Sequence, residues 1–318
     1  MTESKTPAWA RKRVFRHHEK LIQAALFLCA ALSVLTTAAI IMVLLGNAVY
    51  APGEKKAFFE QVSLWQFLTG THWKPVDGPA GRFGMIPLLS GTFMVALIAS
   101  LVSVPTGLGA AIYMSEYAAP REREFLKPIL EVLAGIPSVI YGFFALKFIT
   151  PYILKPLLGM FGLELGSFNA LSAGIVVGIM VTPLIASLSE DVIRSVPRSL
   201  REAAFALGST RFDVSVRVVV PAALSGILAA FLLAFSRAIG ETMAVVIAGG
   251  TQPIATLNPL RGAQTMTAFM VHASNGDSAA DSISRMSIYA IGIALFVITL
   301  TINVISGWIL RRYREVYQ

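Results

Sequence analysis

Charged residues are scarce in this sequence. Asp, Glu, Lys and Arg account for 14% of its 318 residues, against 55% hydrophobic residues and a mean hydropathy of +0.69. A soluble domain usually carries about a quarter charged residues. The hydrophobic residues are concentrated in runs of about 18 or more, long enough for a helix to cross the hydrocarbon core of a bilayer. The composition therefore predicts an all-α integral membrane protein.

Several kinds of chemistry are excluded because their residues are missing. The single cysteine, Cys29, lies inside the first hydrophobic run, so neither a disulfide framework nor a cysteine-based metal site can be built. The four histidines form no H-E-x-x-H pair for zinc. No Gly-Lys dipeptide occurs, which excludes a P-loop for ATP phosphates. We expect no catalytic residue, metal or cofactor in this chain, and if ATP drives it, a separate chain must hydrolyse the ATP.

Six hydrophobic segments are predicted to span the membrane as helices: residues 21–45, 85–114, 129–146, 171–188, 221–247 and 286–309. The second contains Pro105, which predicts a tilt or a break there. Residues 147–170 are partly hydrophobic but interrupted by two lysines and two prolines, so we expect an interfacial or re-entrant connection. The connection 248–285 is expected to hold a short helix at residues 265–273.

The distribution of basic residues predicts the orientation in the membrane. The N-terminus, residues 115–128, residues 189–220 and the C-terminus together hold 17 Lys and Arg, against 8 in the alternate connections. Because basic connections stay in the cytoplasm, both termini are predicted to be cytoplasmic. Topology and contact with anionic lipid then account for the net charge of +8, without a nucleic-acid partner.

The sequence divides into four parts on this basis. A basic cytoplasmic segment (1–20) precedes the first membrane helix and its external loop (21–84). A core with five membrane helices (85–312) contains the cytoplasmic loop 189–220, and a short cytoplasmic tail (313–318) ends the chain.

Two charged residues lie inside the fifth predicted span, Arg237 and Glu241. Four residues apart on a helix, they share one face and can meet. A charge near mid-bilayer costs about 2.5 to 3.5 kcal/mol, so such residues usually face a partner or an aqueous path. The pair either neutralises itself and fixes helix packing, or forms an oxyanion site in which the guanidinium binds the anion bidentately.

A carboxylate in such a site has its own chemical consequence. Glu241 can orient Arg237, or it can accept a hydrogen bond from a ligand hydroxyl, which favours hydrogen phosphate over fully ionised sulfate. Ser236, Thr242 and Ser138 can donate hydrogen bonds to the same anion. Serine and threonine in membrane helices more often bond within the protein, an alternative that ranks first for Ser138.

The longest predicted cytoplasmic loop carries a spaced motif: Glu202-Ala203-Ala204, then Gly208, then Pro221. It resembles the E-A-A-x(3)-G-x(9)-I-x-L-P signature of the permeases of binding-protein-dependent ABC importers. Val218 and Val220 replace the family's Ile and Leu, which are conservative changes. The residues themselves favour a helix ending at Gly208 and a second short helix up to Val220, a helical elbow that can dock on a partner.

Further stretches are similar to the PstC family of phosphate-specific permeases within that group. They are Phe83-Gly84, Pro87-Leu88, Gly91-Thr92, Ser115-Glu116-Tyr117, Leu133 to Gly142 and Arg237 to Val245. The resemblance implies a type I ABC importer permease fold, half of a heterodimeric pore in the bacterial inner membrane. It also implies that Arg237 and Glu241 line the phosphate path and that the elbow docks on an ATPase.

The partners implied by the resemblance are a sister permease (PstA), an ATPase dimer (PstB) that binds ATP and Mg, and an external phosphate-binding protein (PstS). Three other functions stay open on the residues alone: a permease for another oxyanion such as sulfate or molybdate, an ion-coupled secondary transporter, and a membrane enzyme. The last has no second catalytic group placed near Glu131 or Glu241.

Overall fold

The computed structural model describes residues 16–50, 57–75, 81–276 and 282–312. The predicted C-terminal tail and most of the basic N-terminal segment lie outside these ranges. The described part is nearly all helical, as predicted, and its strands are β1 (Trp73–Lys74) and β2 (Arg82–Phe83). The two strands pair antiparallel, with Trp73 opposite Phe83 and Lys74 opposite Arg82.

Five helical stretches are long and apolar enough to cross a membrane: Glu19–Tyr50, Ile86–Tyr117, Ser138–Gly159, Ala170–Ser195 and Ile283–Ile309. A bent pair, Arg211–Ala222 with Leu224–Ile239, whose two parts meet at 72°, raises the number to six if it is counted as one span. The elements involved are α1 (Arg16–Leu45) with π-helix η2 (Gly46–Tyr50), α4 (Ile86–Ile112) with η3 (Tyr113–Tyr117), α8 (Ala170–Ser195), α12 (Leu224–Ile239) and α15 (Ile283–Arg312).

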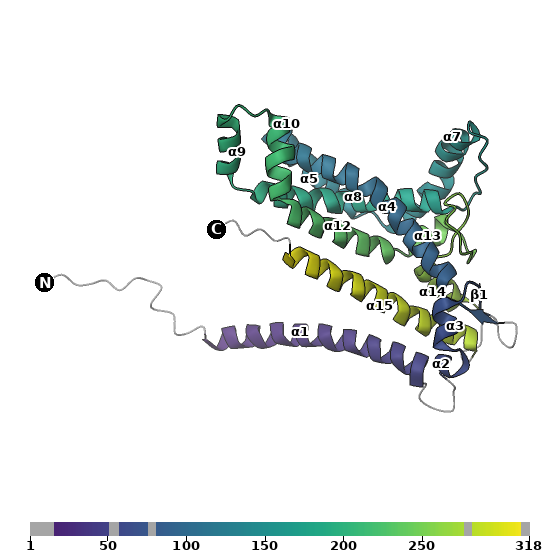
Figure 1. Ribbon diagram of the computed structural model, residues 1–318. Helices are drawn as coiled ribbons and strands as arrows, with labels where there is room; N and C mark the ends of the chain where they lie inside the picture. Colours follow the sequence, from purple (N-terminus) through teal and green to yellow (C-terminus); the bar gives the residue numbers. More distant parts are fainter. Residues whose placement is uncertain (1–15, 51–56, 76–80, 277–281, 313–318) are drawn as a thin grey trace.

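Figure 1 shows these helices side by side. Helix α1 begins and α15 ends at the end of the bundle that carries α9 (Arg198–Ala206) and α10 (Arg211–Val214). We call this the elbow end. The strands and the short helices α2 (Phe58–Gln61), α3 (Leu64–Thr69) and α14 (Met266–Asn275) lie at the opposite end, called the hairpin end.

The third predicted span, residues 129–146, is wrong. Helix α5 (Pro120–Ala134) ends at Gly135, and Pro137 precedes α6 (Ser138–Phe144) in an extended conformation. Proline also disfavours helical geometry at the residue before it, so the hydrophobic run breaks at 135–137. Helix α5 has no buried residue, and the span begins instead at Ser138.

The connection expected at 147–170 is therefore largely part of the third span. Helix α6 continues into the π-helix η4 (Ala145–Leu154) and α7 (Lys155–Gly159). The helical stretch includes Pro151, inside η4, and Pro156, at the start of α7, so neither proline ends it. Helix α4 likewise continues through Pro105 without a break.

Small residues set the packing between α4 and α8 in the middle of the bundle. A Cβ placed on Gly174 would lie 2.5 Å from Cβ of Ile98, and one on Gly178 would lie 2.8 Å from the carbonyl oxygen of Ala99. Such contacts are too close for any side chain larger than hydrogen. The G-x-x-x-G pair at 174 and 178 is thus a helix-packing face.

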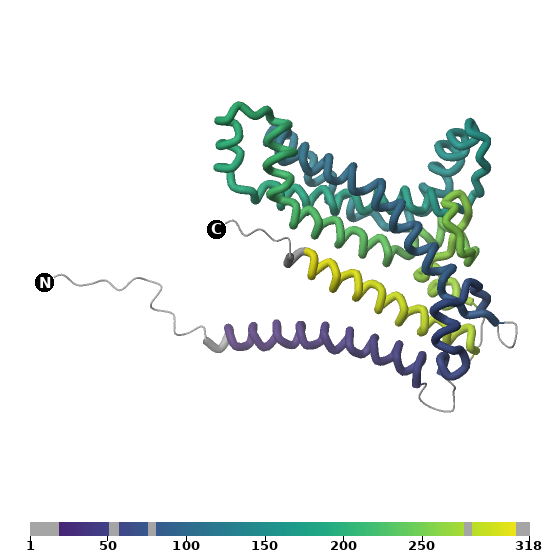
Figure 2. The backbone as a smooth tube through the Cα atoms, in the orientation of Figure 1, coloured from purple at the N-terminus to yellow at the C-terminus, as the bar shows by residue number. Residues whose placement is uncertain are grey.

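The hairpin end is closed by aromatic rings. Phe58 lies edge-on to Phe67 and Phe83, and Trp73 lies edge-on to Phe269 of α14 with ring centroids 4.9 Å apart. Thr265 caps α14 by accepting a hydrogen bond from the N–H of Ala268, which confirms the short helix expected there. The tube in Figure 2 shows this segment against the start of α15.

Candidate functional site

The residues predicted to meet the transported anion surround a break in the fifth span. Helix α12 ends at Ile239, and α13 (Met243–Ala248) begins after three intervening residues. Arg237 and Glu241 therefore do not lie on one continuous helix, in contrast to the prediction. Gly240 ends α12. The side chain of Glu241 caps the start of α13, because its Oε1 atom accepts a hydrogen bond from the N–H of Ala244 at 3.2 Å.

The unwound residues 240–242 are held by short local bonds and by α14. The Thr267 hydroxyl donates to the carbonyl oxygen of Glu241 at 2.7 Å, and the Thr242 hydroxyl donates to the carbonyl oxygen of Gly240 at 3.1 Å. The Oε1 atom of Glu241 has one hydrogen bond, and within the described ranges Oε2 has none. One carboxylate oxygen is left to accept from a ligand.

Arg237 lies in the last turn of α12 with an exposed side chain. Among the described residues it makes no ion pair, including with Glu241. The self-neutralising pair considered for these two residues is therefore absent from this arrangement. A guanidinium left without a carboxylate in a membrane-spanning segment is suited to bind an anion.

The three hydroxyl candidates have different surroundings. The Ser236 hydroxyl donates to Oδ1 of Asn303 on α15 at 3.0 Å, which joins two helices. The Thr242 hydroxyl is taken by Gly240, as described above. Ser138 opens α6 and is half-buried, and its hydroxyl bonds to no other described residue. Of the three candidates, Ser138 alone has a hydroxyl that donates no hydrogen bond to another described residue.

Sequence reasoning placed both lysines of the third span, Lys147 and Lys155, in a connection, because it assigned residues 147–170 to one. Lys147 belongs to η4 and to the span Ser138–Gly159, and its side chain is exposed. The break at Gly135-Ile136-Pro137 was the signal available in the sequence, since it shifts the span toward Lys147.

The predicted helical elbow is confirmed by the structure. Helix α9 ends in a Schellman motif, in which the N–H of Ser209 donates to the Ala204 carbonyl and the N–H of Gly208 donates to that of Phe205. Gly208 has φ +83°, a conformation that favours glycine. The chain then continues through α10, the π-helix η5 (Ser215–Val219) and α11 (Val220–Ala222), which contains Pro221.

The elbow leaves part of its motif uncovered. Glu202 and Ala203 are exposed, while Ala204 is buried against the bundle. Three large apolar side chains are also exposed here: Phe205, Leu207 (88% exposed) and Phe212. A group of exposed apolar residues on a protruding element is typical of a surface that contacts another protein.

Ion pairs attach the elbow and α5 to the end of α8. Arg201 of α9 donates to Glu116 of η3 and to the Ile193 carbonyl, both at 2.9 Å. Glu190 of α8 has no exposed side-chain surface, and it accepts from Arg123 at 2.7 Å and Lys127 at 3.0 Å, both on α5. The hydrogen bond of Lys127 to Asp191, together with its bond to Glu190, raises the pKa of this lysine. These charged pairs hold α5 to the bundle.

The fold and these features define a class: a multi-pass membrane protein with an interrupted, charged fifth span and a protruding helical elbow. The chain belongs to the family of binding-protein-dependent transport system inner membrane components, whose model matches residues 103–315.

Curated relatives narrow the comparison. The chain is 32% identical over 271 residues to the probable ABC transporter permease protein YqgH of Bacillus subtilis, covering 84% of this chain and 85% of that protein. It is 34% identical over 262 residues to the phosphate transport system permease protein PstC of Mesorhizobium japonicum, covering 78% and 79%. It is 35% identical over 261 residues to PstC of Xylella fastidiosa, covering 77% and 78%.

Solved structures share the fold. A chain of a bacterial ABC transporter involved in the import of the polysaccharide alginate matches with a TM-score of 0.66 at 16% identity, covering 96% of this chain and 100% of that chain. A chain of the MetNI methionine ABC transporter in an inward-facing conformation matches with a TM-score of 0.54 at 17% identity, covering 72% and 94%. The fold is that of an ABC importer permease.

Proposed function

We propose that this chain is a permease subunit of an ATP-driven importer of inorganic phosphate and forms one half of a heterodimeric pore. Its identity of 34% and 35% to two proteins named phosphate transport system permease PstC supports this substrate. The observation that carries the proposal is the exposed, unpaired Arg237 beside the unwound residues 240–242 of a membrane span. A cation in that place attracts an oxyanion.

Glu241 provides the selectivity in this proposal. Its Oε2 atom can accept the hydroxyl hydrogen of hydrogen phosphate, whereas sulfate has no hydrogen to donate and would be repelled by the carboxylate. Ser138, Ser236 and Thr242 are the proposed hydroxyl contacts of the path. Of these, Ser236 and Thr242 must give up their bonds to Asn303 and Gly240 before they can donate to the anion.

The partners follow from what the chain has and lacks. With no P-loop in the sequence, ATP and Mg bind in a separate ATPase dimer of the PstB type. Its proposed dock is the elbow, through Glu202 to Ala204, Gly208, Pro221 and the exposed apolar side chains around them. A sister permease of the PstA type completes the pore, and a binding protein of the PstS type delivers phosphate at the hairpin end. The elbow end is then cytoplasmic, with both termini.

The mechanism is alternating access. ATP binding and hydrolysis move the elbow, and the pore opens alternately toward the two sides of the membrane. Arg237 binds the anion weakly in transit, because a site that holds phosphate tightly cannot release it.

The test is uptake of labelled phosphate by the complete transporter, reconstituted in vesicles with ATP on the elbow side. Arg237→Gln and Glu241→Gln are each expected to reduce uptake about tenfold or more, which corresponds to about 1.4 kcal/mol. Arg261→Gln, at an exposed arginine outside the spans, is the control and should leave uptake unchanged. Wild-type uptake in both Arg237→Gln and Glu241→Gln would remove these residues from the path.

Two further conditions separate the other functions. Inhibition by excess sulfate or molybdate would identify a permease for another oxyanion. Loss of uptake on adding an uncoupler at constant ATP would identify an ion-coupled transporter.

A further inference from the structure

The chain is interrupted between α5 and α6 at residues 135–137, which we call the first break. At the elbow end, Lys127 of α5 donates to Glu190 of α8, and at the other end Thr150 of η4 accepts from Asn169, which caps the start of α8. Pro137 is ten residues from Lys127 and thirteen from Thr150, or about 15 Å and about 20 Å at about 1.5 Å per residue. The hydrocarbon core is about 30 Å thick, so these two contacts lie near its surfaces and the first break lies in its interior. The apolar stretch that starts at Ser138 therefore begins near mid-membrane and extends past the start of α8.

Several backbone groups at the first break have no hydrogen-bond partner. The Tyr141 hydroxyl donates to the Leu133 carbonyl at 3.0 Å, which satisfies one group at the end of α5. Gly135 and Pro137 are exposed. Within the described ranges, the unpaired groups are the carbonyl oxygens of Ala134, Gly135 and Ile136 and the N–H groups of Ser138 and Val139. An unpaired backbone group is costly in hydrocarbon, so irregular backbone at this depth occurs where protein covers it or water reaches it, and lipid is excluded.

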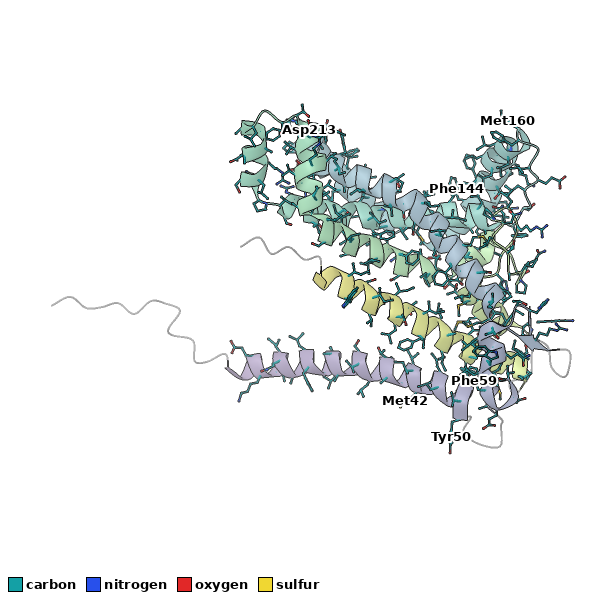
Figure 3. The ribbon with its side chains drawn as sticks, in the orientation of Figure 1. Met42, Tyr50, Phe59, Phe144, Met160 and Asp213 are labelled. Carbon is teal, nitrogen blue, oxygen red and sulfur yellow. The ribbon has the colours of Figure 1, made fainter. Side chains whose placement is uncertain are left out.

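The first break lies beside a second break, residues 240–242 between α12 and α13. A Cβ on Gly142 of α6 would lie 3.1 Å from the Cα of Ala244 of α13, so the two helices are in direct contact. Both helices run from their breaks toward the start of α8, where Asn169 bonds to the Ala248 carbonyl as well as to η4. Phe144, at the end of α6, lies away from the elbow in Figure 3. The two breaks are therefore at corresponding ends of two packed helices.

Arg237 lies at a similar depth. Gly226 of α12 packs directly against Val192 of α8, and Arg237 is eleven residues further along the chain, or about 16 Å. The first break is about 15 Å from the ion pair of Glu190, which is two residues before Val192 on α8. The exposed guanidinium and the unpaired backbone groups are thus at the same level of the bundle.

We infer that the first break lines an aqueous path for the oxyanion, together with the second break and Arg237. Water supplies the hydrogen bonds that the backbone groups lack and also solvates the guanidinium, so one path accounts for both, whereas a protein cover would need a partner for each group. Interrupted helices near the midplane are suited to this role, because their irregular backbone can be solvated there. The inference rests on the proposed function for the identity of the anion, but contact of the first break with water does not depend on it.

Cysteine accessibility tests the path directly. In a Cys29→Ser background, Gly135→Cys is assembled into the complete transporter and treated with a water-soluble anionic thiosulfonate. A Cβ at this position would meet no atom closer than 3.4 Å, so the side chain fits. Ser138→Cys, which exchanges a single heavy atom, is the second reporter and decides the test if Gly135→Cys does not assemble. Both reporters are expected to react.

Leu101→Cys is the matched control. Leu101 is 69% exposed and lies at a similar depth, because its neighbour Val102 contacts Gly178, twelve residues or about 18 Å before Glu190 on α8. Helix α4 is unbroken there, so lipid can cover this position. A thiol reacts as the thiolate, which is disfavoured in hydrocarbon, so Leu101→Cys should react at least about tenfold more slowly than the reporters. If neither reporter reacts, with or without ATP, the inference is overturned and a second subunit covers the first break.

Protection by phosphate tests whether this water-filled path is the one that the anion takes. Inorganic phosphate is expected to slow the reaction of Gly135→Cys about threefold or more by occupying the same space. Equal rates with and without phosphate, in a transporter that imports phosphate, would overturn the assignment to the anion path. If sulfate, not phosphate, is imported and protects the cysteine, the phosphate assignment fails while the first break stays on the path. If phosphate is imported and both reporters are inert, the inference about the first break fails alone.

Discussion

Gly208 illustrates how much one residue contributes to the elbow. It ends α9 with a positive φ and donates one of the two bonds of the Schellman motif. A Cβ at this position would meet no heavy atom within 4 Å, so a side chain is opposed by backbone conformation alone and not by space.

Gly208→Ala is therefore expected to destabilise the end of α9 by about 1 kcal/mol, the usual cost of a left-handed non-glycine residue. Hydrogen exchange of the α9 amides should accelerate about fivefold. Gly109→Ala is the control: it also has open space around it but lies within helix α4, where alanine is favoured, so exchange there should not increase. Unchanged exchange in Gly208→Ala would contradict the role given to this cap.

At this scale the sequence predicts well where local chemistry decides. The end of a helix at Gly208 is predicted because glycine's backbone freedom suits the left-handed conformation that ends a helix. The relation of Arg237 to Glu241 could not be predicted, because a four-residue spacing implies a shared face only on an unbroken helix. Gly240 and the capping bond of Glu241 end that helix between them.

At the scale of elements, the attachment of α5 is unusual. This helix has no buried residue, and its contact with α8 is made through Glu190, Arg123 and Lys127. A fully buried carboxylate with two cations is stable only as long as its partners stay in place.

Glu190→Gln leaves both cations without their buried partner. We expect it to lower the stability of the chain by about 1 to 3 kcal/mol, because the side chains of Arg123 and Lys127 are 26% and 24% exposed and can turn toward water. Asp191→Asn removes a carboxylate whose side chain is 56% exposed and should cost less than about 1 kcal/mol. Thermal unfolding of the purified complex measures both. Similar midpoints for Glu190→Gln and the wild type would show that α5 is held by other contacts.

The third span shows where sequence periodicity fails for an element. Residues 129–146 are hydrophobic enough to suggest a membrane helix, yet Gly135 and Pro137 divide them. A hydropathy value averaged over a window does not register such a break, whereas the backbone conformation at Gly135 and Pro137 interrupts the helix.

At the scale of the whole molecule, the two ends of the bundle are distinct. The elbow, with its exposed Leu207, lies at one end. At the other end lie the strands, α14 and the loop that carries Leu257. The number of spans could be predicted from composition, because the hydrocarbon thickness fixes the length of each helix. Which helices touch could not, since lipid and protein interiors are equally apolar.

The proposed orientation is tested by labelling from outside. In a Cys29→Ser background, Leu257→Cys should react with a membrane-impermeant thiol reagent on intact cells, because this side chain is 90% exposed. Leu207→Cys, equally accessible on the elbow, should react only after the cells are opened. The reverse pattern would place the elbow outside and contradict the assignment of the ATPase dock.

The elbow and α12 meet at an angle of 72°, so a rotation of the elbow would swing α12 as a lever. Its pivot is the single residue Ala223, with the docking surface on one arm and Arg237 far along the other. From Leu224 to Arg237 the arm is about 20 Å long at about 1.5 Å per residue. A turn of about 10° at the pivot displaces the guanidinium by about 3.5 Å, beyond the reach of a hydrogen bond. In the proposed transport cycle, a small movement of the elbow would therefore be enough to release an anion bound by Arg237.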